Sequence, residues 1–167
     1  MAERRILRRD GELMTVAIES RFGSEEDLHS AVAAHPEVLP AEDVGLGLLV
    51  PLANELDLGH GPIDLLCADA TGRLVIVEFK RGSETPDVRK VVAQVLDYGA
   101  SLWRVSYGDL EQGCARCAPG FEGSLADHVA DRLAELGQSE FDAEGFRRGA
   151  ADVFDMGGFV VRCVGRD

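Results

Sequence analysis

The sequence predicts a single α/β domain in which a mixed central β-sheet is flanked by helices. Three observations lead to this prediction. The chain has 167 residues, 46% of them hydrophobic, which suits one compact domain with a substantial core. Apolar, β-compatible segments follow one another between residues 46 and 80, separated by short turns. Apolar residues then recur at helical spacing as far as residue 102, so a helix should pack on that sheet.

Charge and cysteine content exclude several broad classes. The chain carries 17 basic and 30 acidic residues, a net charge of −13, which is the wrong sign for coating nucleic acid by bulk electrostatics. Basic residues are concentrated at positions 4–9 and 80–90, so the sequence is compatible with a local basic groove on an otherwise acidic protein. Four unevenly spaced cysteines do not form a disulfide framework, and neither a transmembrane segment nor a signal-like N-terminus is present. We therefore expect a cytoplasmic protein without a membrane partner.

The N-terminal part divides into an arm and the start of the core. Residues 1–19 are expected to form a basic N-terminal arm or strand, and residues 20–112 a core. The core opens with Ser24-Glu25-Glu26-Asp27, a capping-box pattern that starts a helix, which Pro36 closes. Helical spacing places Glu25 near the buried edge of this helix, which makes it the better functional candidate of the two glutamates.

A β-meander and a long helix follow. The meander consists of an apolar segment over 46–56 and strands over 63–68 and 74–80. Thr85 and Pro86 then provide the N-cap and first turn of the long helix. Within residues 113–167, the pattern predicts helices over 124–136 and 143–154 and a last strand over 159–164, all in the same domain. An ending there would also suit a domain truncated from a longer protein.

Charged residues interrupt the two most apolar strands of the meander. Strand alternation places Glu78 and Lys80 on one face, and a tight turn can bring Asp64 of the preceding strand beside Glu78. An ionised group inside an apolar strand is costly unless it is paired or holds a metal. Two adjacent carboxylates repel each other unless a divalent cation supplies the opposite charge.

Magnesium is the cation that suits this pair. Mg²⁺ takes oxygen ligands and retains waters that can be activated, and Mn²⁺ can substitute for it. Lys80 beside the metal could position or deprotonate an attacking water, or stabilise developing negative charge. We therefore expect Asp64 and Glu78 to bind the metal in an enzyme that hydrolyses phosphodiester bonds.

The residues Asp64, Glu78-Phe79-Lys80 and the later Gln94-Val-Leu-Asp-Tyr98 resemble the PD-(D/E)XK nuclease superfamily and its NucS-like predicted endonucleases. The resemblance covers roughly residues 20–112 and implies a restriction-endonuclease-like fold. It also implies a metal held by Asp64 and Glu78, Lys80 as the catalytic lysine and Glu25 as an accessory acid. Gln94 and Tyr98 would lie near the site on one helix face, in agreement with their spacing.

Substrate contacts and partners follow from the same resemblance. DNA is the expected partner, and RNA stays open. Tyr98, Arg81, Arg89 and Lys90 are candidates for contacts with the substrate, although the basic residues also suit an ordinary solvated cluster. A homodimer and an additional domain of a parent protein are both compatible with the sequence.

A plainer interpretation competes with the nuclease. Glu78 and Lys80 could form an ordinary ion pair at a strand end, and Glu25 could be a first-turn acid favoured by the helix dipole. The alternative function is then a catalytically inactive module of the nuclease fold that binds nucleic acid or a protein partner. The net charge of −13 favours this alternative.

Overall fold

The computed structural model describes residues 5–10, 13–18, 24–57, 59, 61–80, 88–103, 105–117, 121–156 and 158–165. The side chains of the first two strands and of some positions in later elements, Glu25 and Lys80 among them, lie outside this description. Arg81 lies outside it entirely. The described elements, in chain order, are β1 (Arg5–Asp10), β2 (Leu13–Ile18), α1 (Glu25–Ala34), the 3₁₀ helices η1 (Pro36–Val38) and η2 (Glu42–Val44), β3 (Val50–Asp57), β4 (Pro62–Ala68), β5 (Leu74–Lys80), α2 (Val88–Leu102), α3 (Tyr107–Cys117), α4 (Leu125–Glu135), α5 (Ala143–Met156) and β6 (Val160–Gly165).

The central sheet has the strand order β3-β4-β5-β6. The first three strands form the predicted antiparallel meander, and β6 returns to pair with β5 in parallel. The prediction of an α/β fold with a mixed central sheet flanked by helices is therefore confirmed. The segment expected as an arm or strand folds into a separate two-stranded hairpin, β1–β2.

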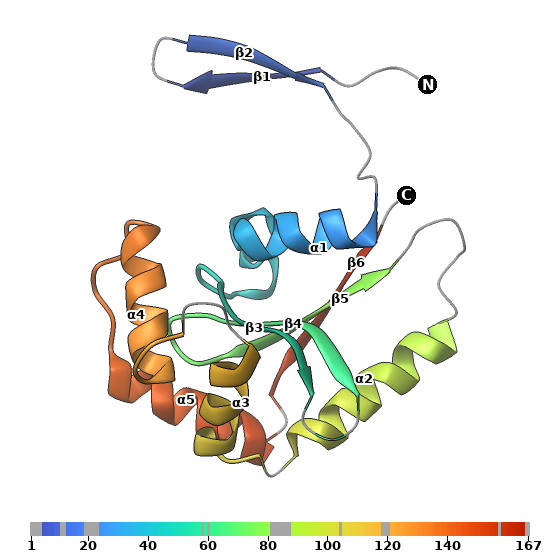
Figure 1. Ribbon diagram of the computed structural model, residues 1–167, viewed down its shortest axis with the longest axis vertical. Helices are drawn as coiled ribbons and strands as arrows, with labels where there is room; N and C mark the ends of the chain where they lie inside the picture. Colours follow the sequence, from blue (N-terminus) through green and yellow to red (C-terminus); the bar gives the residue numbers. More distant parts are fainter. Residues whose placement is uncertain are drawn as a thin grey trace.

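Helices cover both faces of the central sheet (Figure 1). On one face, α1 and the loop after it pack on Leu65, Cys67, Val75, Val77 and Phe79. On the other face, helices α2 to α5 pack on a second cluster from the same strands, which includes Leu66, Leu74 and Ile76. From Leu65 to Ala68 and from Leu74 to Val77, successive residues alternate between the two clusters, which is the reason that these parts of β4 and β5 are apolar on both sides.

Three helices begin with the same Ser-x-x-Asp capping box. Ser24 and Asp27 cap α1, and Ser124 and Asp127 cap α4. At α3, the hydroxyl of Ser106 accepts from the N–H of Asp109, and the Asp109 carboxylate accepts from the N–H of Ser106. The sequence analysis did not identify α3, because two glycines weaken its helical pattern; the repeated capping box was the signal for it.

The turn between β4 and β5 lies against α5. Gly72, at φ +85°, and Gly149 of α5 approach so closely that a Cβ on Gly149 would lie 1.9 Å from the carbonyl oxygen of Thr71. A Cβ on Gly72 would lie 2.3 Å from the carbonyl oxygen of Phe146. Only glycine fits at these positions, so this contact locks α5 onto the end of the hairpin.

Candidate active site at the open end of the β4–β5 hairpin

Asp64 and Glu78 meet where β4 and β5 separate. Paired residues on the two strands run from Ala68 and Leu74 to Leu65 and Val77, although both strands continue further. The next pair in this register would be Asp64 and Glu78. At that point the carboxylate Oδ2 of Asp64 accepts from the backbone N–H of Phe79, at 2.8 Å. The structure thus places Asp64 opposite Glu78 in register and bonds its carboxylate to the residue that follows Glu78.

Glu78 faces helix α2. Its neighbours Val77 and Phe79 belong to the cluster under α1, so Glu78 points to the opposite side of the sheet, where α2 lies. The residue is only 5% exposed, whereas Asp64 is half-buried. A buried carboxylate needs donors from its surroundings, because water no longer supplies them.

Gln94 and Tyr98 supply those donors from one face of α2. The amide Nε2 of Gln94 lies 2.6 Å from Oε1 of Glu78 and 2.8 Å from the hydroxyl oxygen of Tyr98. The Tyr98 hydroxyl in turn donates to Oε2 of Glu78. The spacing of four residues puts both side chains one helical turn apart, so the two donors hold the carboxylate between them.

The network keeps Tyr98 in its neutral form. Burial raises the pKa of Tyr98 above its ordinary value, and the hydrogen bond to Glu78 and the negative charges of Glu78 and Asp64 raise it further. A phenol with a raised pKa remains protonated at neutral pH and goes on donating to Glu78. The contacts therefore fix the orientation of the Glu78 carboxylate.

The other predicted site residues lie around this pair or outside the description. Lys80 is the last residue of β5, and alternation puts it on the same side of the strand as Glu78, but its side chain is outside the described residues. Glu25 is the first residue of α1, and its side chain is likewise not described. Arg89 and Lys90 are exposed in the first turn of α2.

Glu55 is a feature of this region that the sequence analysis missed. It lies on β3 between two paired positions, Asn54 with Leu65 and Leu56 with Ile63, and thus opposite Asp64. Its φ of +50° makes it the one non-glycine residue with a positive φ in the described part of the chain. The left-handed conformation is unfavourable for a glutamate, and its sequence neighbourhood shows no signal for it. The strand beside Asp64 is therefore irregular.

The donor chemistry of the pair fits Mg²⁺ or Mn²⁺. Both side chains offer carboxylate oxygens, and each oxygen keeps a second lone pair after accepting one hydrogen bond. Among the described residues, no group of three or more His, Cys, Asp or Glu side chains is placed to hold a metal ion. Asp64 and Glu78 could offer carboxylate oxygens to a cation that retains several waters.

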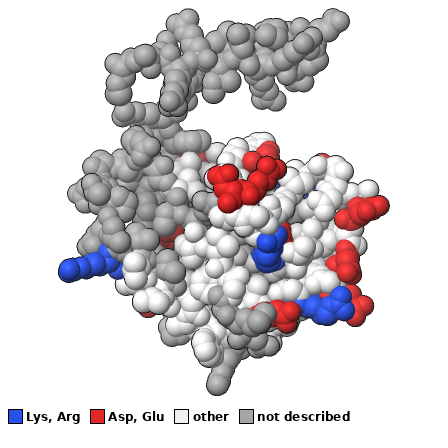
Figure 2. Space-filling view, turned by 180° about the vertical axis from the view of Figure 1, so that it is seen from behind, with Lys and Arg blue, Asp and Glu red and all other residues white. Residues whose placement is uncertain are grey.

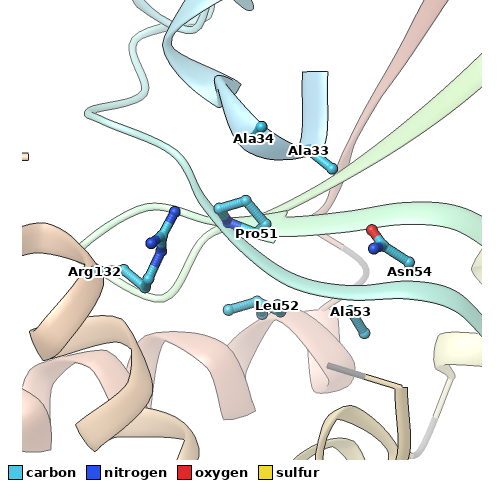
Figure 3. Close-up of a pocket in the computed structure, with 7 residues that line it drawn as sticks. All are labelled: Ala33, Ala34, Pro51, Leu52, Ala53, Asn54 and Arg132. Atoms are coloured by element: carbon cyan, nitrogen blue, oxygen red, sulfur yellow. The ribbon is translucent and has the colours of Figure 1, made fainter. Parts of the chain in front are cut away.

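A hollow of about 330 Å³ lies elsewhere, between α1, β3 and α4 (Figure 3). Its lining consists of small or apolar side chains, Asn54 and Arg132; the lining residues are Ala33, Ala34, Pro51, Leu52, Ala53, Asn54 and Arg132. None of the predicted site residues whose side chains are described contributes to it, and Glu78 with Gln94 and Tyr98 lies elsewhere.

The surface shows no broad basic region on the face drawn in Figure 2, as far as its residues are described. Acidic side chains gather along the right edge of that face, and basic ones occur singly, near the centre and at both edges. Within the described residues, no helix has the length and hydropathy needed to cross a membrane.

Partial similarity links the chain to known endonucleases. A stretch of 78 residues, 46% of this chain, is 37% identical to a protein described as endonuclease NucS from Aeropyrum pernix. A stretch of 62 residues (36% of the chain) is 42% identical to an endonuclease NucS from a Parafrankia species, and 69 residues (41%) are 39% identical to one from a Mycobacterium species.

Each of these matches covers 28% of the length of the relative. No family model matches the chain, and no solved structure matches it significantly. The chain is thus similar, over part of its length, to part of several proteins named as endonucleases.

Proposed function

We propose that this chain is a nuclease domain of the restriction-endonuclease-like fold that hydrolyses phosphodiester bonds of DNA with the help of a divalent cation. One observation carries the proposal: Glu78 is held by Gln94 and Tyr98 beside Asp64, where β4 and β5 separate. The partial similarity to proteins named endonuclease NucS supports it independently of this geometry.

The arrangement is costly for the fold and is therefore better explained by chemistry. Glu78 is buried and lies next in register to a second carboxylate. Placing two acids together raises the free energy of the folded state unless a positive charge is bound between them. The donors of Glu78 come from a separate helix and that of Asp64 from the backbone of β5, which fixes the positions of the oxygens before a ligand arrives.

The roles follow from these positions. A Mg²⁺ ion bound to Asp64 and Glu78 would supply positive charge against the phosphate oxygens and lower the pKa of a coordinated water. The N–H of Phe79 orients the Asp64 carboxylate, and Gln94 with Tyr98 orients that of Glu78. Lys80 positions the attacking water or takes its proton, and Arg89 and Lys90, with Arg81 before them, contact phosphates of the DNA.

Cleavage assays test the proposal. The purified chain is incubated with single-stranded, duplex and branched DNA, and with RNA, in Mg²⁺ or Mn²⁺. We expect cleavage of at least one DNA substrate, lost in Lys80→Ala and Asp64→Asn and retained in the control Asp131→Asn, an exposed acid on α4. Circular dichroism verifies that the inactive variants fold. A fully intact panel with either metal would contradict the proposal.

The runner-up is a catalytically inactive module of the same fold that binds nucleic acid or protein. The net charge of −13 and the scarcity of basic side chains among the described residues on the face drawn in Figure 2 favour it. Titration calorimetry with Mn²⁺ separates the two. Binding that disappears in Asp64→Asn but persists in Asp131→Asn supports the enzyme, whereas a wild-type chain that binds no Mn²⁺ supports the module.

A further inference from the structure

The positive charge of this chain is concentrated near its N-terminus. Residues 4–9 contain four arginines and no acidic residue, although the whole chain has a net charge of −13. Residues 22–72 are the opposite extreme, because they contain ten acidic residues and no lysine or arginine. Much of the chain therefore repels a polyanion, and contacts with one must be concentrated where the local charge is positive.

The hairpin β1–β2 carries this charge on one of its two strands. Strand β1 contains Arg5, Arg8 and Arg9, whereas β2 has no charged residue. Each arginine of β1 is paired in register with an uncharged residue of β2; the pairs are Arg5–Ile18, Arg8–Thr15 and Arg9–Met14. No cross-strand partner therefore balances the charge of β1.

The cationic strand is an edge strand. The hairpin forms a two-stranded sheet of its own, and in Figure 1 it stands away from the central sheet. Among the described strands, β1 pairs with β2 alone, so its outer edge has no strand beside it. Because an isolated two-stranded hairpin is only marginally stable in water, a partner that binds this edge would also stabilise it.

We propose that this hairpin holds the DNA substrate, with β1 lying along a phosphate backbone. The proposal rests on the DNA substrate of the proposed function and adds the element that grips it. Arg5 and Arg9 are four residues apart, about 13 Å along a β-strand, a length over which one DNA strand carries about four phosphates. A guanidinium also matches phosphate geometry with two parallel hydrogen bonds.

The connection to α1 keeps the hairpin close to the candidate site. Strand β2 ends at Ile18 and α1 begins at Glu25, so seven residue steps separate them. An extended chain covers at most about 3.5 Å per step, which limits the separation to about 25 Å. The resemblance assigned Glu25 to the site as an accessory acid. A DNA segment of about seven nucleotides is long enough to span from the hairpin to this end of α1.

DNA binding measured without cleavage tests the proposal. The anisotropy of labelled duplex and single-stranded oligonucleotides of equal length is recorded with the full chain in EDTA at several salt concentrations. Each phosphate contact releases counterions, so Arg5→Gln/Arg9→Gln should make the slope of log Kd against log salt shallower by about two. Its affinity at low salt should fall roughly tenfold.

Two further double variants separate charge from folding. Arg5→Lys/Arg9→Lys keeps the charge and should keep the wild-type slope, which a purely structural role of the arginines would not predict. Arg116→Gln/Arg148→Gln removes the same charge at exposed positions of α3 and α5 and should also bind like the wild type. Circular dichroism verifies that all three double variants fold.

The hairpin and the nuclease function can fail separately. A wild type that binds neither oligonucleotide, or a wild-type slope in Arg5→Gln/Arg9→Gln, would refute the role of the hairpin and leave any cleavage activity standing. Hairpin-dependent binding without cleavage in Mg²⁺ or Mn²⁺ would support the hairpin and contradict the nuclease. If Arg5→Gln/Arg9→Gln changed the oligomeric state in sedimentation but not DNA binding, the hairpin would belong to a protein contact and the proposal would be wrong.

Discussion

Both ends of the β4–β5 hairpin hold a buried acidic side chain, but the hydrogen-bond donors to the two carboxylates come from different parts of the chain. At the turn, Asp69 is 1% exposed and accepts hydrogen bonds from the backbone and hydroxyl of Thr71 and from the backbone and side chain of Arg73. At the open end, Glu78 accepts from two side chains of a helix that follows much later in the chain.

This difference separates a structural carboxylate from a candidate catalytic one. Apart from the N–H of Gly47, at 3.5 Å, the printed donors of Asp69 lie two to four residues away. They include the guanidinium of Arg73, at 2.7 Å, so the turn neutralises its own acid. At Glu78, Gln94 and Tyr98 are neutral donors from a remote helix, and they orient the carboxylate. An oriented negative charge next to a second carboxylate is what a metal ion needs.

The largest effect should come from breaking the open end alone. Glu78→Gln removes the charge but keeps the size of the side chain, and we expect kcat/KM for DNA cleavage to fall by roughly 10³-fold, about 4 kcal/mol of transition-state stabilisation. The free energy of unfolding from chemical denaturation should change by about 1 kcal/mol or less, since glutamine keeps the size and packing of the side chain. A variant that cleaves DNA at the wild-type rate would remove Glu78 from the proposed site.

Gly149→Ala should disrupt the packing of α5 on the β4–β5 turn and leave the contacts of Glu78 unchanged. The new Cβ would lie 1.9 Å from the carbonyl oxygen of Thr71, so α5 and the turn must move apart. We expect a loss of about 3 kcal/mol in the free energy of unfolding. Gly158→Ala is the matched control, because no atom lies within 4 Å of its Cβ position. Equal stability of the two variants would show that the turn and α5 do not pack as described.

Asp69 should make the turn sensitive to acid. Burial alone would raise the pKa of its carboxyl, but the hydrogen bonds of Thr71 and Arg73 and the charge of Arg73 outweigh it and hold the pKa below the usual range. Its contribution to stability is therefore present above the unfolded pKa, about 3.9, and is lost as the pH falls through the folded value.

Asp69→Asn should accordingly lower the free energy of unfolding at pH 7 by about 2 kcal/mol and flatten its decline in acid. Urea titrations from neutral to acidic pH measure both effects. Asp131→Asn, at an exposed acid on α4, should leave the profile close to that of the wild type. An unchanged acid profile in Asp69→Asn would contradict the structural role.

The smallest effect is expected from Tyr98→Phe, which removes one of the two donors to Glu78 and leaves Gln94 in place. A hydrogen bond to a charged group contributes about 1.5 kcal/mol, so we expect kcat/KM to fall about tenfold. The raised pKa of Tyr98 means that wild-type stability declines as the pH rises above the unfolded value of about 10.

The decline of stability at alkaline pH should be shallower in Tyr98→Phe. Part of it should remain, because burial also raises the pKa of Tyr107. Thermal unfolding between neutral and alkaline pH measures it, and Gln94→Ala, which keeps the phenol, is the comparison variant. An activity equal to that of the wild type would mean that Tyr98 does not position Glu78.

Several elements could be predicted from local signals. Strand β5 was predicted over its observed range because an apolar run is bounded by a glycine-containing turn on one side and by the charge of Lys80 on the other. Helix α1 was predicted from its capping box. The adjacency of Asp64 and Glu78 followed from alternation and a tight turn, since two strands joined by a short turn have few possible registers.

Other features were decided by contacts between distant segments. The parallel return of β6 beside β5, the approach of Gly149 to the turn and the positive φ of Glu55 leave no local trace in the chain. The resemblance implied that Gln94 and Tyr98 lie near the site; only their hydrogen bonds to Glu78 show what they do there.

The sequence by itself thus determined which residues are candidates, because periodicity, capping and turn chemistry act over a few neighbouring residues. The tertiary structure decided which acid belongs to the fold and which to the site. Asp69 and Glu78 are both buried carboxylates on one hairpin, and the origin of their donors distinguishes them. That origin depends on how α2 packs on the sheet, a contact between segments that no local pattern specifies.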